Sequence, residues 1–112
     1  MTEVIILPGF EKDAKKLSKK YSSLKNELIV FIDSTQTKGV QGVSLGSGLF
    51  KARLAVKSKG KGKSGGLRII SYHDVILARN EDSVYLVAIY DKSELSTMEI
   101  KQINKILKSY NL

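Results

Sequence analysis

Cysteine is absent from this 112-residue sequence, and there is a single histidine, His73. Without cysteine the chain has no disulfide framework, no cysteine-based zinc site and no thiol nucleophile. One imidazole is a poor basis for a transition-metal site, and the aspartates do not show the spacing of a magnesium site. We therefore expect no metal and no cofactor. The aspartates that lack this spacing are Asp33, Asp74, Asp82 and Asp91.

Long apolar runs are also absent. The first segment contains Glu3 and only the short apolar run 4–7, so we expect neither a signal peptide nor a membrane span. With 42% hydrophobic and 27% charged residues, the composition favours a folded chain. The length suits a single domain over residues 1–112, and a cytoplasmic protein is the expectation.

Acidic residues are absent from Ser34 to His73, a stretch that contains eight basic ones. The rest of the chain has 11 basic and 11 acidic residues, so this stretch supplies the whole net charge of +8. A neutral scaffold with one basic strip is typical of a surface that binds a polyanion, although a solvated lysine-rich loop has the same composition. The eight residues are Lys38, Lys51, Arg53, Lys57, Lys59, Lys61, Lys63 and Arg68.

The periodicity of apolar residues predicts an α+β domain: an N-terminal strand, a two-helix hairpin, a three-stranded antiparallel meander and a C-terminal helix. Residues 34–47, rich in Thr, Gln, Gly and Ser, are predicted to form a loop, and 80–83 a turn. A capping box formed by Ser96 and Glu99 is predicted to begin the last helix. The predicted strands are 4–7, 49–56, 67–73 and 84–90, and the helices lie over 10–21, 24–32 and 100–110.

Lys51, Arg53 and Arg68 lie on adjacent predicted strands, and Lys92 follows the last strand. Alternation in 49–56 separates an apolar from a basic side, so these cations can converge on one face of the sheet. The segment between the strands, with Gly62-Lys63-Ser64, resembles the end of a nucleotide-binding loop. However, residue 57 is a lysine where that motif has glycine, and a strand rather than a helix follows.

Lysine, arginine and tyrosine are suited to a reaction that needs no metal, the cleavage of RNA by its own 2′-hydroxyl. A site for this reaction orients the hydroxyl, accepts its proton, neutralises the phosphorane and protonates the leaving oxygen. Lysine and arginine clamp the oxyanion, and a lysine among like charges can exchange protons near neutral pH. Tyrosine serves as a proton donor or as a platform for a base.

Residues 59–70, 45–53 and 85–92 resemble three segments of the RelE/HigB-type toxins of bacterial type II toxin–antitoxin modules, in the RelE/ParE superfamily. Residues 59–70, KGKGKSGGLRII, resemble the family's glycine–lysine hairpin. Residues 45–53, LGSGLFKAR, and 85–92, YLVAIYDK, resemble the strands before and after it. The similarity extends over nearly the whole chain and includes the start, residues 10–28.

The resemblance implies a ribosome-dependent mRNA endoribonuclease that works without metal and inhibits translation. It further implies that a cognate antitoxin binds the toxin, that mRNA on the ribosome is the substrate, and that operator DNA is bound only through the antitoxin complex. The catalytic candidates are Lys51, Arg53, Arg68, Tyr90 and Lys92, and the RNA-binding candidates are Lys57, Lys59, Lys61, Lys63 and Tyr72.

Two departures from the better-known members leave the proton-transfer group open. Ser93 follows Lys92 where some members have arginine, and the last helix begins near Met98 and Glu99 rather than with a tyrosine. Tyr90, Tyr72 or a lysine is then the proton-transfer group. Two other functions remain open as alternatives: a ParE-like inhibitor of DNA gyrase and a non-catalytic RNA-binding module.

Overall fold

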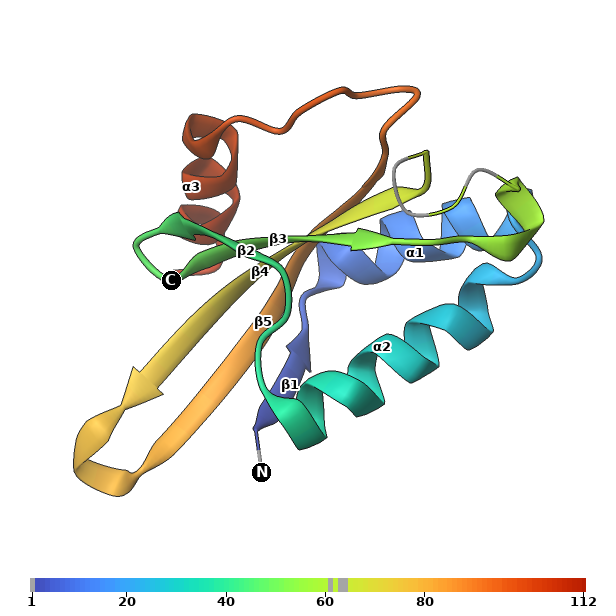
Figure 1. Cartoon of the computed structure of the whole chain (residues 1–112). Coiled ribbons are helices and arrows are strands. Elements are labelled where there is room, and N and C mark those ends of the chain that lie inside the picture. The colour runs from blue at the N-terminus through green and yellow to red at the C-terminus, as the bar shows by residue number, and fades with distance from the viewer. Residues whose placement is uncertain (1, 61, 63–64) are drawn as a thin grey trace.

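A computed structural model describes residues 2–60, 62 and 65–112. A five-stranded sheet has helices α1 and α2 on one face and α3 on the other (Figure 1). The strand order is β1-β5-β4-β3-β2, with β1 parallel to β5 and the other neighbours antiparallel. The predicted α+β fold is confirmed, including its antiparallel meander, β3-β4-β5. The elements are β1 (Glu3–Ile6), α1 (Pro8–Lys20), α2 (Leu24–Lys38), β2 (Val43–Gly46), β3 (Leu49–Leu54), η1 (Lys57–Lys59), β4 (Leu67–Ile76), η2 (Leu77–Arg79), β5 (Glu81–Asp91) and α3 (Ile100–Ser109).

The prediction of a loop over residues 34–47 is wrong. Helix α2 continues to Lys38, and inside it the buried hydroxyl of Thr35 donates to the carbonyl of Phe31 at 2.8 Å, which satisfies this polar group. Strand β2 then pairs with β3. Ser47 and Gly48 join the two strands, both with positive φ, as a two-residue hairpin turn requires.

The capping box lies three residues later than the sequence predicts. Glu99, not Ser96, is the N-cap of α3, and its backbone N–H donates to the side-chain oxygen of Gln102 at 2.9 Å. The Glu99 side chain in turn accepts from the Gln102 backbone, which completes the reciprocal pair. Ile103 and Leu107 of this helix are buried, whereas Ile100 at its start is 47% exposed.

Strand β5 is buried on both faces, which explains its nearly continuous apolar sequence. Leu86 and Ile89 pack on the side of α1 and α2, whereas Val87 and Ala88 both pack on the side of α3. Two successive residues face the same side because the register shifts at this point, which marks a β-bulge. Among the described residues, none of the helices is long and apolar enough to cross a bilayer.

Candidate functional site

Arg53, Arg68 and Tyr90 stand opposite one another on three neighbouring strands. The register pairs Arg53 of β3 with Arg68 of β4, and Arg68 with Tyr90 of β5. Opposed residues of antiparallel strands project from the same face about 5 Å apart. Tyr90 packs in the cluster beside α3, so this row lies on the α3 face of the sheet. We call these three residues the basic row.

Lys51 extends the basic row along β3. It lies two residues before Arg53, on the same face, and it pairs with Ile70, which packs in the α3-side cluster. Lys51 is half-buried and Arg53 is exposed, whereas Arg68 is only 4% exposed. The guanidinium Nη1 of Arg68 donates to the carbonyl of Leu67 at 3.3 Å, so this cation is held against the sheet. The structure thus brings Lys51, Arg53 and Arg68 together, as the alternation predicts.

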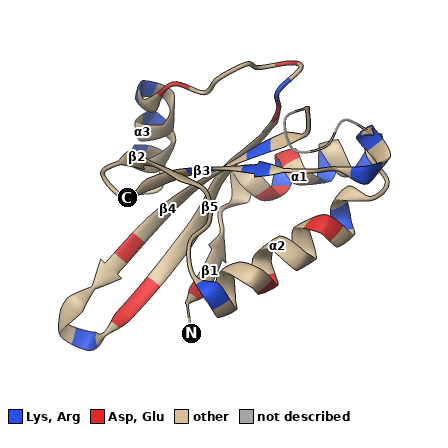
Figure 2. Cartoon of the chain, viewed as in Figure 1, with Lys and Arg blue, Asp and Glu red and all other residues tan. Residues whose placement is uncertain are grey.

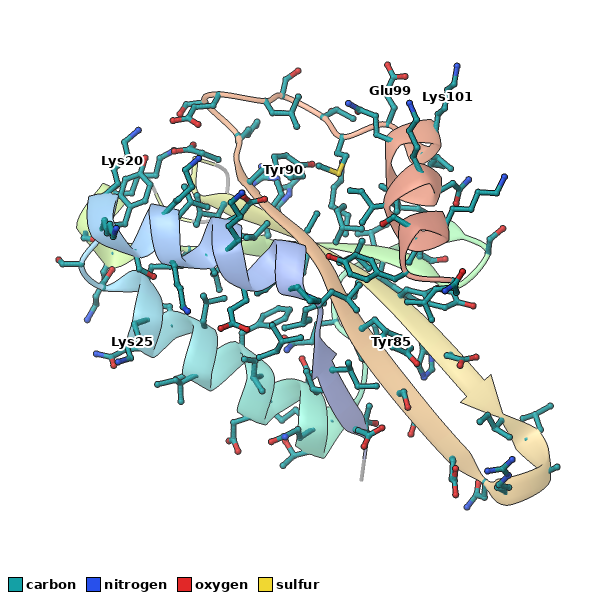
Figure 3. The ribbon with its side chains drawn as sticks, turned by 180° about the vertical axis from the view of Figure 1, so that it is seen from behind. Lys20, Lys25, Tyr85, Tyr90, Glu99 and Lys101 are labelled. Carbon is teal, nitrogen blue, oxygen red and sulfur yellow. The ribbon has the colours of Figure 1, made fainter. Side chains whose placement is uncertain are left out.

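Tyr90 is covered by the connection between β5 and α3. Its side chain lies between the strand and this connection (Figure 3), and the residue is 7% exposed. Its hydroxyl accepts from the backbone N–H of Met98 at 3.4 Å, which is a long hydrogen bond. Lys92 is exposed and lies one residue beyond the end of β5. Tyr90 and Lys92 therefore lie on either side of the point where β5 ends and the connection begins.

Tyr72 does not join the basic row. It lies four residues along β4 from Arg68 and stacks on Tyr85, with ring centroids 6.0 Å apart and planes 27° apart. Both rings pack against the α3-side cluster. Lys57 is exposed at the start of η1, whereas Lys61 and Lys63 lie outside the described residues.

Lys59 is predicted to bind RNA from the turn, but its ammonium group is paired inside the molecule. Its ammonium group forms an ion pair of 2.7 Å with Asp91 and donates to the carbonyl of Gly65 at 2.6 Å. The Lys59 side chain is 8% exposed and that of Asp91 is fully buried. Lys59 is therefore committed to a contact inside the molecule.

The Asp91 carboxylate accepts hydrogen bonds from three residues: Lys59, Tyr21 and Ser93. The Tyr21 hydroxyl donates at 2.5 Å, and the backbone N–H and hydroxyl of Ser93 donate at 2.9 and 2.8 Å. Burial alone would raise the pKa of Asp91, but the Lys59, Tyr21 and Ser93 donors outweigh it and hold that pKa well below its usual range. The bond to Asp91, with burial, raises the pKa of Tyr21. We call Asp91, Lys59, Tyr21 and Ser93 the Asp91 network.

The sequence does not predict the Asp91 network. The spacing of the aspartates argues only against Asp91 as a magnesium ligand, and Tyr21 lies at the end of the first predicted helix with no role of its own. One signal was available, because Asp91 is the acidic residue that directly ends an otherwise apolar buried strand. A carboxylate in that position needs a partner, and a buried charge is found paired. The partner's position in the turn is set by the tertiary fold.

Gly66 has no room for a side chain where the turn enters β4. A Cβ at this position would lie 2.1 Å from the carbonyl oxygen of Leu54. We expect Gly66→Ala to lower the free energy of unfolding by about 1–3 kcal/mol, because the backbones of β3 and the turn must separate. Urea denaturation measures this loss. Gly60→Asn is the control, since Gly60 has open space and a left-handed φ of 74° that asparagine tolerates. Equal stability of Gly66→Ala and wild type would contradict the expectation.

Charge divides the molecule along the sheet. Figure 2 shows basic residues on β3 and near the η1 end of the sheet, whereas the far half of the β4–β5 hairpin carries acidic residues on its stem. In that stem, Asp82 accepts from His73 at 3.0 Å and from Thr2 at 2.9 Å. The hydrogen bond from His73 lowers the pKa of Asp82, and the bond from Thr2 lowers it by a smaller amount. Within the basic strip, the described cations of β3, η1 and β4 thus lie at one end of the sheet, whereas Lys38 lies at the end of α2.

The fold and the basic row define a small α+β domain with its excess positive charge on and beside one sheet. The chain belongs to the RelE family: the family described as RelE toxin of RelE / RelB toxin-antitoxin system matches residues 9–111. It is therefore a toxin of a toxin–antitoxin system, and membership implies an antitoxin partner. Comparison with curated proteins gives no match for this chain.

Proposed function

We propose that this toxin is a metal-independent endoribonuclease that cleaves messenger RNA on the ribosome and so inhibits translation. The observation that carries the proposal is the basic row, which aligns two guanidinium groups and a phenol on one face of the sheet. Membership in the RelE toxin family supports the same reading. The proposed setting is the cytoplasm. The antitoxin restrains the toxin, and operator DNA is reached only through the antitoxin complex.

The residues of the basic row divide the reaction between them. The 2′-hydroxyl of the messenger attacks the adjacent phosphorus, the 5′-oxygen leaves, and a 2′,3′-cyclic phosphate forms. Arg68, held against the sheet, and Arg53 neutralise the charge that develops on the phosphorane. Tyr90 or Lys92 transfers the protons at the attacking and leaving oxygens. Lys51 and Lys57 bind neighbouring phosphates, which is a role suited to exposed or half-buried cations.

Tyr90 becomes accessible when RNA replaces its contact with the connection to α3. The hydrogen bond from the Met98 backbone to the Tyr90 hydroxyl is long, at 3.4 Å, so little free energy opposes its replacement. A phosphate oxygen or a 2′-hydroxyl can then occupy the same position beside the phenol. The neighbouring Arg68 supplies the charge that draws the phosphate there.

Induction of the chain in bacterial cells, followed by mapping of messenger 5′ ends, tests this function. We expect growth arrest with new 5′ ends inside translated reading frames, and loss of these ends when translation initiation is blocked. Arg53→Ala is expected to reduce the number of new ends about tenfold or more. The exposed guanidinium neutralises the charge of the transition state and contributes little to the stability of the fold. Arg79→Ala, at the far turn of the hairpin, is the matched control.

Other outcomes of the same experiment would contradict an endoribonuclease. Growth arrest with DNA damage and intact messenger would indicate a ParE-like gyrase inhibitor. Binding of RNA without new 5′ ends would indicate a non-catalytic RNA-binding module. The chemical form of the ends is an independent measurement, because attack by the 2′-hydroxyl leaves a cyclic phosphate and a free 5′-hydroxyl.

A further inference from the structure

The Asp91 network joins three segments that are far apart in the sequence. Tyr21 lies at the corner between α1 and α2, Lys59 in η1, Asp91 at the end of β5 and Ser93 in the turn that follows. The backbone of this turn is tied to the same residue, since the N–H groups of Glu94 and Leu95 both donate to the Asp91 carbonyl at 3.0 Å. One buried carboxylate thus organises the end of the sheet.

The network adjoins the basic row on two sides. In the ladder, Asp91 pairs with Leu67, and the next pair is Tyr90 with Arg68. Lys59 also donates to the carbonyl of Gly65, in the segment that leads into Arg68. The chain entering the row at Arg68 and the chain leaving it at Tyr90 are therefore held by the same ammonium–carboxylate pair.

Lys92 is fixed by its two neighbours. Asp91 lies before it and Ser93 after it, and the Asp91 carboxylate accepts from both the N–H and the hydroxyl of Ser93. The Lys92 side chain itself is exposed. The backbone position of this cation is consequently determined by the network, while its ammonium group stays accessible to a ligand.

We infer that Asp91 and Lys59 are positioning residues for the basic row, and that Lys59 makes no contact with RNA. The inference rests on the proposed endoribonuclease function. A buried ion pair adds little stability over apolar side chains of similar size, so its presence here is better explained by the geometry it fixes. Catalytic side chains need supporting contacts that hold them within a fraction of an ångström.

Lys59→Met and Lys57→Met form a matched pair for testing the inference. Each removes one positive charge from η1, but only Lys59 is in the network. On ribosomes programmed with a messenger, we expect Lys59→Met to lower the maximal cleavage rate about 10- to 100-fold with little change in the half-saturating concentration. Lys57→Met should instead raise the half-saturating concentration and leave the maximal rate near that of wild type. A Lys59→Met variant with a normal maximal rate and weakened binding would overturn the inference.

A second readout does not depend on cleavage. Backbone ¹⁵N order parameters of Gly65, Lys92 and Ser93 should fall in Lys59→Met and remain at wild-type values in Lys57→Met. Unchanged order in Lys59→Met would overturn the inference, even for a wild-type chain that cleaves no RNA. Absence of cleavage by the wild type would overturn the proposed function and leave this second test intact.

The uncharged double variant Lys59→Met/Asp91→Asn guards against loss of folding in the single variant. It removes both charges and keeps an acceptor for Ser93 at position 91. We expect its maximal cleavage rate to fall no further than that of Lys59→Met, because both changes disrupt one shared contact. If the rate of the double variant falls by the product of the reductions measured for Lys59→Met and for Asp91→Asn alone, the two residues do not act as one positioning unit and the inference is overturned.

Discussion

If the chain is the proposed endoribonuclease, Arg68→Lys is expected to lower the maximal rate of messenger cleavage by about 100-fold or more. The substitution keeps the positive charge but replaces the planar fork of a guanidinium with a single ammonium group. Arg68 lies in the middle of the basic row, between Arg53 and Tyr90, which is the position that the proposed mechanism gives to the reacting phosphate. Loss of one donor to a developing oxyanion costs about 10²–10³ in rate. Cleavage of a messenger on purified ribosomes, at saturating substrate, gives the measurement.

Two variants keep this expectation open to contradiction. Arg79→Lys makes the same chemical change in η2, at the far turn of the β4–β5 hairpin, and should leave the rate unchanged. Arg68 is buried, so thermal unfolding must accompany the rates. Arg53→Lys changes an exposed member of the row without a folding cost and should lower the rate about tenfold. Wild-type rates for both Arg53→Lys and a folded Arg68→Lys would exclude the row as the catalytic centre.

Periodicity is sufficient to predict most of the fold because each long element buries one regular side. The alternation in β3 and the helical spacing of Phe10, Ala14 and Tyr21 translate directly into the cluster under α1 and α2. Residues 34–47 escaped prediction for a local reason. Thr35 is satisfied by a hydrogen bond within α2, and Ser47 adopts a positive φ in the β2–β3 turn, so polar and small residues occur inside regular structure.

The candidate site was predictable only in the part that depends on strand register. Lys51 and Arg53 share a face because side chains alternate along a strand, which follows from the sequence, and the β3–β4 register places Arg68 on the same face. Which cations remain accessible does not follow from the sequence. Lys57 and Lys59 are two residues apart in one basic turn, yet one is exposed and the other is paired with Asp91, 32 residues away. Tertiary contacts between distant segments decide that difference.

Lys59→Met is expected to lower the free energy of unfolding by about 3 kcal/mol at pH 7. The substitution leaves the fully buried Asp91 carboxylate without its cation, and removal of one member of a buried pair costs about 3–5 kcal/mol. The remaining donors from Tyr21 and Ser93 favour the lower end of that range. Urea denaturation measures the loss, with Lys57→Met expected within about 0.5 kcal/mol of wild type.

The pH dependence distinguishes loss of an ion pair from loss of packing. In the wild type the folded-state pKa of Asp91 lies below the usual 3.8, so its contribution is complete above that pH and is lost as the pH falls through the folded-state pKa. Without Lys59, burial is less opposed, and the carboxyl group takes up a proton at higher pH. The stability difference between wild type and Lys59→Met should therefore shrink between pH 7 and pH 3.

The double variant Lys59→Met/Asp91→Asn should recover at least half of the single variant's loss at pH 7, since it contains no unpaired buried charge. A difference that stays constant with pH, or a double variant less stable than Lys59→Met, would indicate that the methylene packing of Lys59, rather than its charge, holds η1 against β5.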